Sequence, residues 1–465
     1  LYNGNLIHSE IARRGLLGDV YIGSTLVDMY AKCGSLKKAQ EVFDKLPIRN
    51  VVTWTALITG YLENGLPEEA LFCYQEMEHA SMPLALDAVI LISGLKACGH
   101  VRSAHKGQEI HKQVAMIGLE RDLLVGSSLV DMYAKCGILS SAQNVLDSLL
   151  PGQDVVPWNS LIVGYLEHGM GEEALRHFEQ MQMCGVSPDN IIFVCVLKAC
   201  GSINALEKGR LVYGEIVMKG LEKDHLVGNA IVDCYAKCYM LEEALEVFRK
   251  LLVRTIISWN SILRSYVEHQ SGKEALVFFM QMQSEGIAPD SITFISVLKA
   301  CASIGSVCDG YKLHVEIAKK GLGGDPIISS TLVDMYAKCG LLVEAQAIFN
   351  MIANRDEVTW NALISGYVEQ GYCEEALICM KKMEEERIPT QLVTFICGLK
   401  GCSSVTGLLK EGQKLHANVV MKGLEKDTII CSTLVDMYTK YGMMTDAWLV
   451  CKDLIMTDVV SWNTL

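Results

Sequence analysis

A nine-residue stretch recurs along the chain at nearly constant spacing. "LVDMYAKCG" occupies residues 26–34 and returns unchanged at 129–137 and 332–340, and the variants "IVDCYAKCY" and "LVDMYTKYG" begin at Ile231 and Leu434. Self-similarity at a fixed period indicates a repeat protein, in which each unit packs mainly on its neighbours. The period is about 100 residues, longer than one helix pair, so each period must contain several smaller units.

Two further units recur between the copies of this stretch. One opens on a tryptophan segment, as in "VVTWT" at Val51, and the other runs from "LKACG", as at Leu95, to a closing aspartate. Within the tryptophan unit, Trp54, Leu57 and Ile58 share one apolar helical stripe. Gly65 then suits the left-handed end of that helix, and acidic residues open a second helix.

Each small unit therefore predicts two antiparallel helices. A single helix pair cannot bury its apolar stripe, whereas stacked pairs share a continuous core. The predicted fold class is all-α, an α-solenoid superhelix of stacked antiparallel helix-turn-helix pairs.

Composition and charge restrict the functional classes. Half of the residues are apolar and only nine are prolines, which suits continuous helix, but no stretch has the length of uncharged apolar sequence that a membrane span needs. Many of the 18 cysteines recur inside helical patterns, where cysteine acts as a small apolar residue in a reducing compartment. The net charge of −13 argues against a general polyanion binder, so any nucleic-acid function must rest on local placement.

The sequence offers no complete catalytic signature. His-x-Glu, the first half of the zinc deaminase signature, occurs at His8, His177 and His314, but its Pro-Cys-x-x-Cys partner does not. Phosphate loops and nucleophile elbows are also missing. Cys33 is replaced by tyrosine in the last copy of the stretch, so a thiol is not required there. We therefore expect no catalytic residues, no metal and no cofactor in this segment.

The three-way alternation resembles the pentatricopeptide repeat proteins of plants, in the subclass that alternates P-, L- and S-type motifs. The tryptophan units resemble P motifs, the "LKAC" units with their "KGLE-D" ends resemble L motifs, and "LVDMYAKCG" resembles the core of the S motif. The predicted organisation is a partial L motif at 1–19, thirteen S, P and L motifs at 20–458, and the start of a further P motif at 459–465. The chain starts at Leu1, not Met, and stops within a motif, so we interpret it as part of a longer protein.

The fifth residue of each P and S motif is small and polar in the middle of an otherwise apolar helix. One such residue would be read most simply as a solvent-facing or capping group, but all ten copies are Asn, Ser or Thr. The resemblance implies binding of single-stranded RNA at about one base per repeat, with the base read by the fifth and last residues of the motif. An asparagine amide suits a pyrimidine edge, a shorter serine or threonine leaves room for a purine, and a closing aspartate can orient the pair.

Carried over motif by motif, the resemblance implies a base for each pair. The adenine pair is Ser24 with Asn50. The guanine pairs are Thr55 with Asp87, Ser127 with Asp154, Ser330 with Asp356, and Ser432 with Asp458. The uracil pairs are Asn159 with Asp189 and Asn260 with Asp290. Asn229 with Thr255 and Asn361 with Gln391 depart from the usual pairs and imply a pyrimidine; Asn463 holds the same position in the last partial motif.

The L motifs leave their bases open, because their fifth residues cannot form side-chain hydrogen bonds; these are Ile92, Val194, Ile295 and Ile396. The expected RNA is A-G-n-G-U-n-Y-U-n-G-Y-n-G, read 5′ to 3′ along the chain.

Two other positions complete the predicted reading face. The resemblance implies that aliphatic second residues sandwich each base, and in the P motifs these are Val52, Val156, Ile257 and Val358. It also implies phosphate contacts for the lysine at position 13 of every S motif, although this lysine would also complement the helix dipole. The five lysines are Lys32, Lys135, Lys237, Lys338 and Lys440. The tryptophans are expected in the core, on the opposite stripe.

The function that the resemblance implies is sequence-specific binding of an organellar transcript, in a mitochondrion or chloroplast, for C-to-U RNA editing. Its expected partners are single-stranded RNA and RNA-editing proteins, with the deaminase in a C-terminal region or acting in trans, and no membrane. The alternative, favoured by the acidic charge, is a protein- or peptide-binding helical scaffold in an RNA-processing complex.

Overall fold

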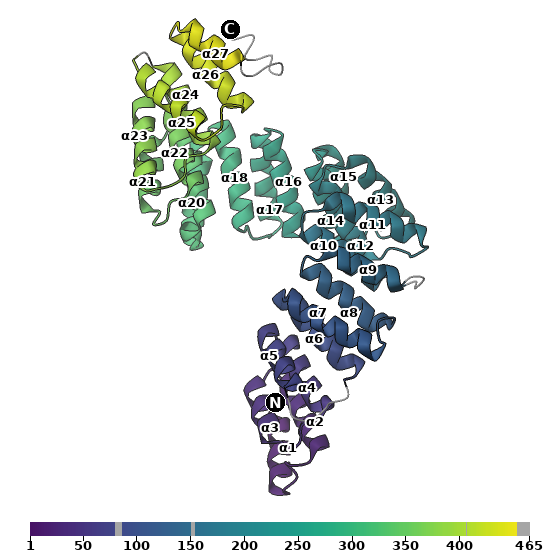
Figure 1. The fold of residues 1–465 in the computed structure, drawn as a ribbon. Helices are drawn as coiled ribbons and strands as arrows, with labels where there is room; N and C mark the ends of the chain where they lie inside the picture. The colour runs from purple at the N-terminus through teal and green to yellow at the C-terminus, as the bar shows by residue number, and fades with distance from the viewer. Residues whose placement is uncertain (80–85, 150–153, 406, 453–465) are drawn as a thin grey trace. The chain divides into compact units, whose positions relative to one another are not determined.

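The computed structural model describes residues 1–79, 86–149, 154–405 and 407–452 (Figure 1). Over these residues the secondary structure consists of 27 α-helices and one short 3-10 helix, without a strand. The predicted all-α class is therefore confirmed. None of the helices in the described ranges has the length and apolar character that crossing a membrane requires.

The chain forms two compact units. The first comprises Leu1–Cys238 with Glu246–Leu252, and the second comprises Tyr239–Leu245 with Val253–Leu465, so that α15 (Leu241–Lys250) contributes residues to both. We describe each unit by itself.

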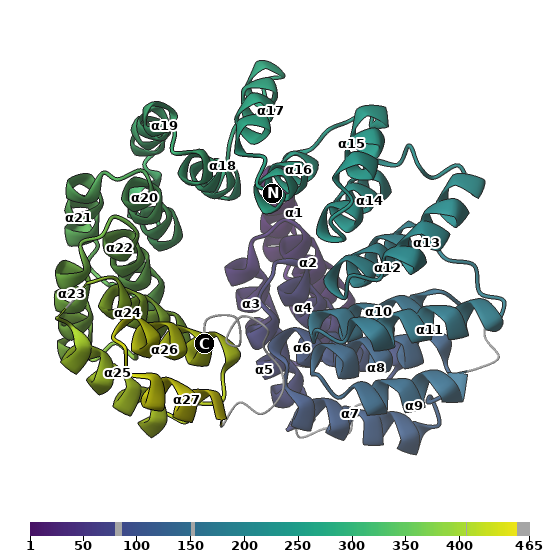
Figure 2. The same cartoon turned by 90° about the horizontal axis from the view of Figure 1, so that it is seen from above.

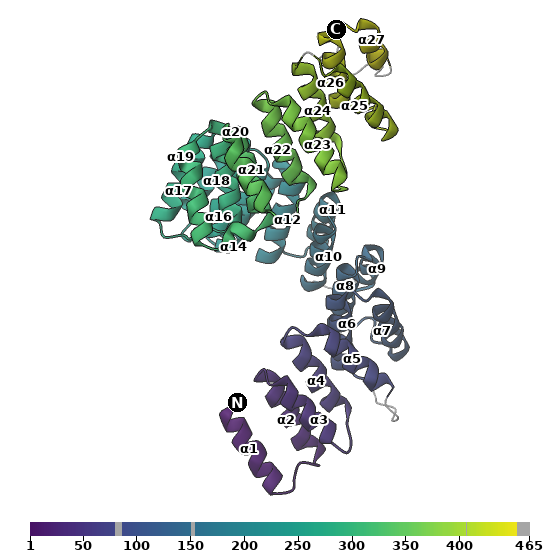
Figure 3. The ribbon, with the colours of Figure 1, turned by 90° about the vertical axis from the view of Figure 1, so that its left-hand side faces the viewer.

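The first unit contains α1 and six complete helix pairs, followed by α14. Its helices are α1 (Tyr2–Arg13), α2 (Val20–Lys32), α3 (Leu36–Lys45), α4 (Val51–Glu63), α5 (Pro67–Glu78), α6 (Ala88–Val101), α7 (Ala104–Ile117), α8 (Leu123–Lys135), α9 (Leu139–Leu149), α10 (Val156–Glu167), α11 (Gly171–Met183), α12 (Asn190–Ser202), α13 (Leu206–Met218) and α14 (His225–Lys237). Figure 3 shows the pairs following one another in chain order from α1 to α12.

The second unit repeats this arrangement. Its helices are α16 (Ile256–Glu268), α17 (Gly272–Ser284), α18 (Ser291–Ile304), α19 (Val307–Lys319), η1 (Leu322–Gly324), α20 (Pro326–Lys338), α21 (Leu342–Met351), α22 (Glu357–Glu369), α23 (Cys373–Glu385), α24 (Leu392–Ser404), α25 (Leu409–Met421), α26 (Thr428–Lys440) and α27 (Met444–Lys452).

Each unit has two layers of helices. The first helix of each motif packs against the first helix of the next, as in the series α16, α18, α20, α22, α24 and α26. The second helices, α17 to α27 in the same unit, form the other layer (Figure 2). Because the first helices are contiguous, side chains at one position of successive motifs are brought into a row.

The apolar stripes form the core between the layers. Trp158, Trp259 and Trp360 are almost completely buried, and Trp54 is only 6% exposed. The predicted core position of these tryptophans is confirmed, while Trp462 lies outside the described residues.

Glycine permits the close approach of neighbouring first helices. In α22, a Cβ added to Gly366 would lie 2.3 Å from the Cβ of Ala337 in α20. A larger residue at Gly366 would therefore push these two helices apart, and with them the side chains that face the groove. Glycine also serves the helix ends, where Gly65 has a φ of +75°. The left-handed turn predicted at Gly65 is thus confirmed.

Candidate nucleic-acid interface

In each of the two units, exposed apolar side chains form a row along the first helices. The second residue of every motif is apolar and at least half exposed to solvent, with relative exposures from 50% for Val156 to 81% for Tyr21. An exposed apolar row of this regularity marks a binding surface. The members are Tyr21, Val52, Val89, Leu124, Val156, Ile191, Leu226, Ile257, Ile292, Ile327, Val358, Val393 and Ile429.

The sequence analysis assigned this role only to the P motifs. The S and L motifs continue the row, and the recurrence of an apolar residue at their second position was the signal that was missed. A base held between two neighbouring motifs would need an apolar contact from each of them. Apolar second residues in all three motif types can supply both contacts, whereas P-motif residues alone cannot.

A groove on α2, α4 and the start of α6 brings several predicted site residues together. Its lining includes the fifth residues Ser24 and Thr55, the closing residue Asp87, the second residue Val52, and Lys32. Residues as far apart in the sequence as Ser24 and Asp87, 63 positions, thus face one open space. The groove has the polar and apolar groups that a planar, hydrogen-bonding ligand requires.

Each fifth-position hydroxyl already donates its proton to a backbone carbonyl of its own helix. Thr55 donates to the Val51 carbonyl at 2.8 Å, and Ser127 donates to the Leu123 carbonyl at 2.5 Å. Ser24, Ser330 and Ser432 form equivalent bonds with carbonyls three residues earlier. Each hydroxyl therefore presents its oxygen as an acceptor, which matches the N–H groups on the edge of a purine.

The closing residues cap the first helix of the next motif. Asp290, for example, accepts a hydrogen bond from the Thr293 amide at 2.8 Å. Asn50, Asp87, Asp189 and Asp356 accept in the same way from the third residue of the following helix. Asp154 instead accepts a hydrogen bond from the amide of Val156, the first residue of α10. This capping role was not predicted, although an Asp directly before an apolar helix is a standard start signal.

In two P motifs the closing aspartate also binds the fifth-position asparagine. The Asn159 Nδ2 donates to Asp189 Oδ2 at 2.9 Å, and the Asn260 Nδ2 donates to Asp290 Oδ1 at 3.0 Å. Burial works to raise the pKa of the Asp290 carboxyl, but hydrogen bonds from Thr293 and Asn260 together hold that pKa below its usual value. The pairs carried over from the resemblance are therefore in direct contact here.

The other asparagine pairs differ. The Asn361 Nδ2 donates to Glu357 Oε1 at 3.3 Å, on its own helix. The sequence analysis had set the pair with Gln391 apart from the usual ones. Asn229 belongs to the first unit and Thr255 to the second. Asp458 and Asn463 lie outside the described residues.

The L motifs end differently from the P motifs. Asp325 uses one oxygen, Oδ1, to accept from both the Ile327 and Ile328 amides, at 2.8 and 3.1 Å. Asp19, Asp122, Asp224 and Asp427 do the same for their helices. The ψ angle at these caps is between 122° and 128°, whereas it is 179° at Asp189. The fifth residues of the L motifs are half-buried aliphatic groups.

The S-motif lysines are paired within their own helices. Lys32 contacts Asp28 at 2.8 Å, and Lys135 contacts Asp131 at the same distance. Lys237, Lys338 and Lys440 pair likewise with Asp233, Asp334 and Asp436. An exposed pair of this kind contributes little to stability, so a phosphate can compete for the lysine. The aspartate partner, four residues earlier in "LVDMYAK", was visible in the sequence but not interpreted.

Several histidines of the second helices, His8 and His314 of the His-x-Glu stretches among them, pair with tyrosines, whereas His177 pairs with Gln180. His111 Nδ1 lies 2.8 Å from the Tyr133 hydroxyl, and His8, His314 and His416 form the same pair with the tyrosine of the following S motif. Burial lowers the pKa of His111 and of His314. No group of three or more potential metal ligands occurs within the described ranges.

The fold and this face define a helical repeat protein with regularly spaced exposed apolar side chains. A family model described as PPR repeat family matches residues 153–202, 254–303 and 355–404. A second, described as PPR repeat, matches residues 24–51, 52–82, 229–256 and 327–356. Together the matches cover more than half of the sequence, and the chain belongs to the pentatricopeptide repeat family.

Curated relatives agree over nearly the whole chain. A mitochondrial pentatricopeptide repeat-containing protein of Arabidopsis thaliana is 33% identical over 484 residues, covering 99% of this chain and 53% of the relative. A chloroplastic one from the same plant is 32% identical over 448 residues, covering 96% of this chain and 55% of the relative. This chain thus spans about half the length of these relatives.

Among solved structures, the pentatricopeptide repeat protein PPR10 in complex with an 18-nt psaJ RNA element matches with a TM-score of 0.64. The identity is 18%, over 98% of this chain and 77% of that one. This likeness establishes the shared solenoid fold.

Proposed function

We propose that this chain binds single-stranded RNA in a sequence-specific manner, at about one base per motif, as a member of the subclass with alternating P, L and S motifs. The observation that carries this proposal is the combination of the exposed apolar row with the oriented pairs at Asn159 and Asn260. The RNA bound to PPR10 in its solved structure adds support.

In this mechanism the second residues of adjacent motifs hold a base between them, and the fifth residue reads the base edge. A contact of this kind contributes about 1–3 kcal/mol per base in single-strand binders. At Asn159 the bond to Asp189 engages one amide proton, which leaves the second proton for the base. Uracil offers carbonyl oxygens that can accept it.

The same proposal extends to the biological setting. Relatives named mitochondrial and chloroplastic support an organellar RNA as the target, and the motif alternation supports C-to-U RNA editing as the process. In this setting the chain selects the site and performs no chemistry itself. A deaminase would be supplied by a further region of the protein or in trans.

Binding of the predicted 13-nucleotide RNA tests the recognition proposal. At fixed salt, we expect this RNA to bind at least about tenfold more tightly than a version in which G and U are exchanged, since several base contacts are lost together. Equal dissociation constants for the two RNAs would refute base reading.

A single substitution tests the assignment of one base. Asn159→Ser replaces an amide with a hydroxyl that can bond back to its own helix, as Ser127 does. We expect the preference at the fifth base to shift from U toward G. An unchanged preference in a competition assay with the four RNAs that differ at this base would contradict the assignment.

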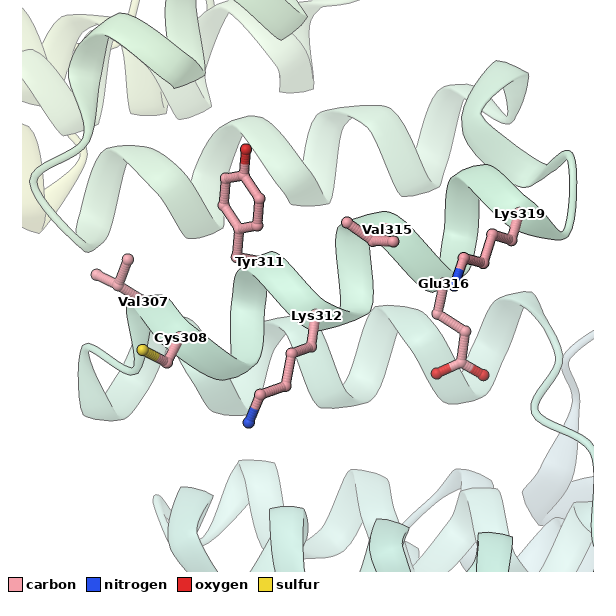
Figure 4. Close-up of a pocket in the computed structure, with 7 residues that line it drawn as sticks. All are labelled: Val307, Cys308, Tyr311, Lys312, Val315, Glu316 and Lys319. Atoms are coloured by element: carbon pink, nitrogen blue, oxygen red, sulfur yellow. The ribbon is translucent and has the colours of Figure 1, made fainter.

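A protein-binding scaffold remains the second candidate, because apolar side chains are also exposed on the second-helix layer. In α19, Tyr311 is 58% exposed and Val315 is 43% exposed. Figure 4 shows the side chains along this helix, with Tyr311 and Lys312 directed to opposite edges. If this surface carried the main function, Tyr311→Ser would abolish activity in the organelle while RNA affinity stayed unchanged.

A further inference from the structure

Every complete L motif has a lysine at the ninth position of its first helix. In a helix this position shares one face with the second and fifth residues, which lie seven and four positions earlier. The four lysines are exposed to solvent, and each unit contains two of them; they are Lys96, Lys198, Lys299 and Lys400. Each L motif thus places a cation on the face that also carries its exposed apolar second residue.

The four ammonium groups have no partner within the described ranges, where none of them forms an ion pair or a side-chain hydrogen bond. The sequence gives the reason, because a lysine on a helix surface pairs with acids three or four positions away. Around Lys299 these positions hold Ile295, Ser296, Ala302 and Ser303, and the other L motifs likewise have no acid at them.

The S motifs differ at the same position. Their ninth residue is an aspartate that holds the lysine at position 13, as Asp334 does for Lys338 at 2.9 Å. The P motifs carry a glutamate at position 13, and Glu369, in the motif before Lys400, accepts a hydrogen bond from Ser365 at 3.2 Å. A phosphate therefore reaches an L-motif lysine without displacing a carboxylate, whereas an S-motif lysine must first leave its aspartate.

The other groups of an L motif cannot read a base edge. In the third L motif the second residue, Ile292, is 59% exposed, and the fifth, Ile295, is half-buried. Both are aliphatic, so they can contact the face of a base but form no hydrogen bond with its edge. Lys299 follows Ile292 by about 10 Å along the helix axis, and helical side chains lean toward the N-terminus. The lysine thus leans toward the nucleotide that Ile292 would contact.

A lysine ammonium is a compact positive charge that suits a phosphate oxygen. Because the net charge of the chain is −13, attraction of RNA phosphates must come from cations that are placed locally and are not already neutralised. The ninth residues of the L motifs meet both conditions.

We propose that the L-motif lysines bind RNA phosphates, so that each L motif holds one nucleotide by its backbone without reading its base. This inference rests on the proposed RNA-binding function. It divides the work between the motifs: the P and S motifs discriminate between bases, and the L motifs add affinity at the four positions written n in the predicted RNA.

The test compares two variants of the whole chain that undergo the same change in net charge. The first removes the four cations with Lys96→Gln, Lys198→Gln, Lys299→Gln and Lys400→Gln. The control makes the same change at four exposed lysines of second helices, which also lack an ion pair in the described ranges, with Lys112→Gln, Lys273→Gln, Lys319→Gln and Lys410→Gln. Dissociation constants for the predicted 13-nucleotide RNA are measured between about 50 and about 200 mM salt.

The logarithm of affinity should depend less steeply on the logarithm of salt concentration in the first variant. The slope should become shallower by about 2.8, since each phosphate contact with a single strand contributes about 0.7. The control variant should keep the slope of the unmodified protein. Arginine at the four L-motif positions retains the charge and should also keep that slope.

A second measurement separates a phosphate contact from a base contact. Lys299 belongs to the third L motif, which would hold the ninth base. Lys299→Gln should weaken binding by the same factor for the four RNAs that differ at this base. A lysine that reads the base edge would instead favour guanine, whose O6 and N7 accept hydrogen bonds.

Three results would overturn the inference: an unchanged slope in the first variant, an equal change in the control variant, or a guanine preference at the ninth base that disappears in Lys299→Gln. A failure of the proposed function looks different. In that case the unmodified protein would bind the predicted RNA and its version with G and U exchanged equally well.

Discussion

The junction from a P to an L motif and the junction from an L to an S motif use the same residue for different purposes. At the P-to-L junction, Asp290 caps α18 and also holds the amide of Asn260. At the L-to-S junction, one oxygen of Asp325 accepts hydrogen bonds from two amides of α20. The fifth residue of that L motif, Ile295, is aliphatic. A closing aspartate therefore caps a helix in both settings, but only at the P-to-L junction does it also orient the amide of the fifth residue.

Further contacts sharpen this difference. At P-to-L junctions a lysine of the L motif reaches back to the closing segment: Lys320 lies 3.1 Å from the Pro289 carbonyl and over the Phe294 ring. At L-to-S junctions the corresponding long-range contact is the bond between His314 and Tyr336. At the P-to-L junction the lysine contact fixes the segment that carries Asp290, the partner of Asn260. At the L-to-S junction the histidine contact joins two packed helices and involves no such pair.

The largest expected effect comes from Asp189→Asn. Asparagine caps helices as well as aspartate does, so stability should change little. Its capping oxygen would face the Ile192 amide and its NH₂ group would face the Asn159 NH₂ group, so the hydrogen bond that orients the Asn159 amide would be lost. We therefore expect the preference for U at the fifth base to fall by about tenfold.

Asp325→Asn is the matched control for this prediction, because Asp325 caps a helix and has an aliphatic fifth residue beside it. Base preference should be the same as in the unmodified protein at every position, measured with RNAs varied one base at a time. A shift caused by Asp325→Asn as large as that from Asp189→Asn would remove the distinction between the two junctions.

A smaller effect is expected from His111→Phe at the L-to-S junction. The variant loses the hydrogen bond with Tyr133, and the unfolding free energy at pH 7.5 should fall by about 1 kcal/mol. Because burial lowers the pKa of His111 from its ordinary 6.5, the unfolded chain binds more protons than the folded chain just below pH 6.5. Stability therefore rises with pH through this window and is lost on acidification.

The measurement is denaturant unfolding between pH 5 and 7.5. The stability of His111→Phe should fall less on acidification than that of the unmodified protein, because one neutral buried imidazole has been removed. Tyr213 occupies the histidine position in another L motif and packs edge-on against Tyr235, so Tyr213→Phe serves as the control without a titrating imidazole. Equal pH slopes for the unmodified protein and His111→Phe would contradict the prediction.

The smallest expected effect concerns the S-motif lysines. If all five contact phosphates, the logarithm of affinity should fall against the logarithm of salt concentration with a slope of about −3.5 from these contacts. Lys135→Gln should reduce the magnitude of this slope by about 0.7. Lys112→Gln, on the exposed surface of α7, should leave it unchanged; a flat salt dependence for the unmodified protein would exclude the phosphate role.

Much of the fold was predictable from the sequence because periodicity acts locally. The apolar stripe around Trp54, the glycine at the end of that helix and the fixed repeat length together require stacked helix pairs. The set of fifth residues was also visible, since a polar residue that recurs ten times in an apolar helix stands out. The phosphate role of the lysines was predicted without their aspartate partners, although the spacing from Asp131 to Lys135 suffices for an ion pair.

Other features depend on residues that are distant in the sequence. Asn260 and Thr293 are 33 positions apart, and His111 and Tyr133 are 22 apart. Contacts over such separations exist only after the helices have stacked, so neither the pattern nor the composition indicated them. For the same reason the two-residue code treats Asn159 and Asn260 as equal, while their oxygens have different surroundings.

By itself the sequence determined the repeat, the two helices of each motif and the positions that carry polar or apolar side chains, because these follow from local periodicity and from helix-end chemistry. The tertiary structure decided which closing aspartate meets an asparagine, which way each amide points, and whether its oxygen already has a donor. These outcomes depend on the cap geometry and on the buried third residue of the next motif, which meet the reading residue only when successive first helices pack side by side.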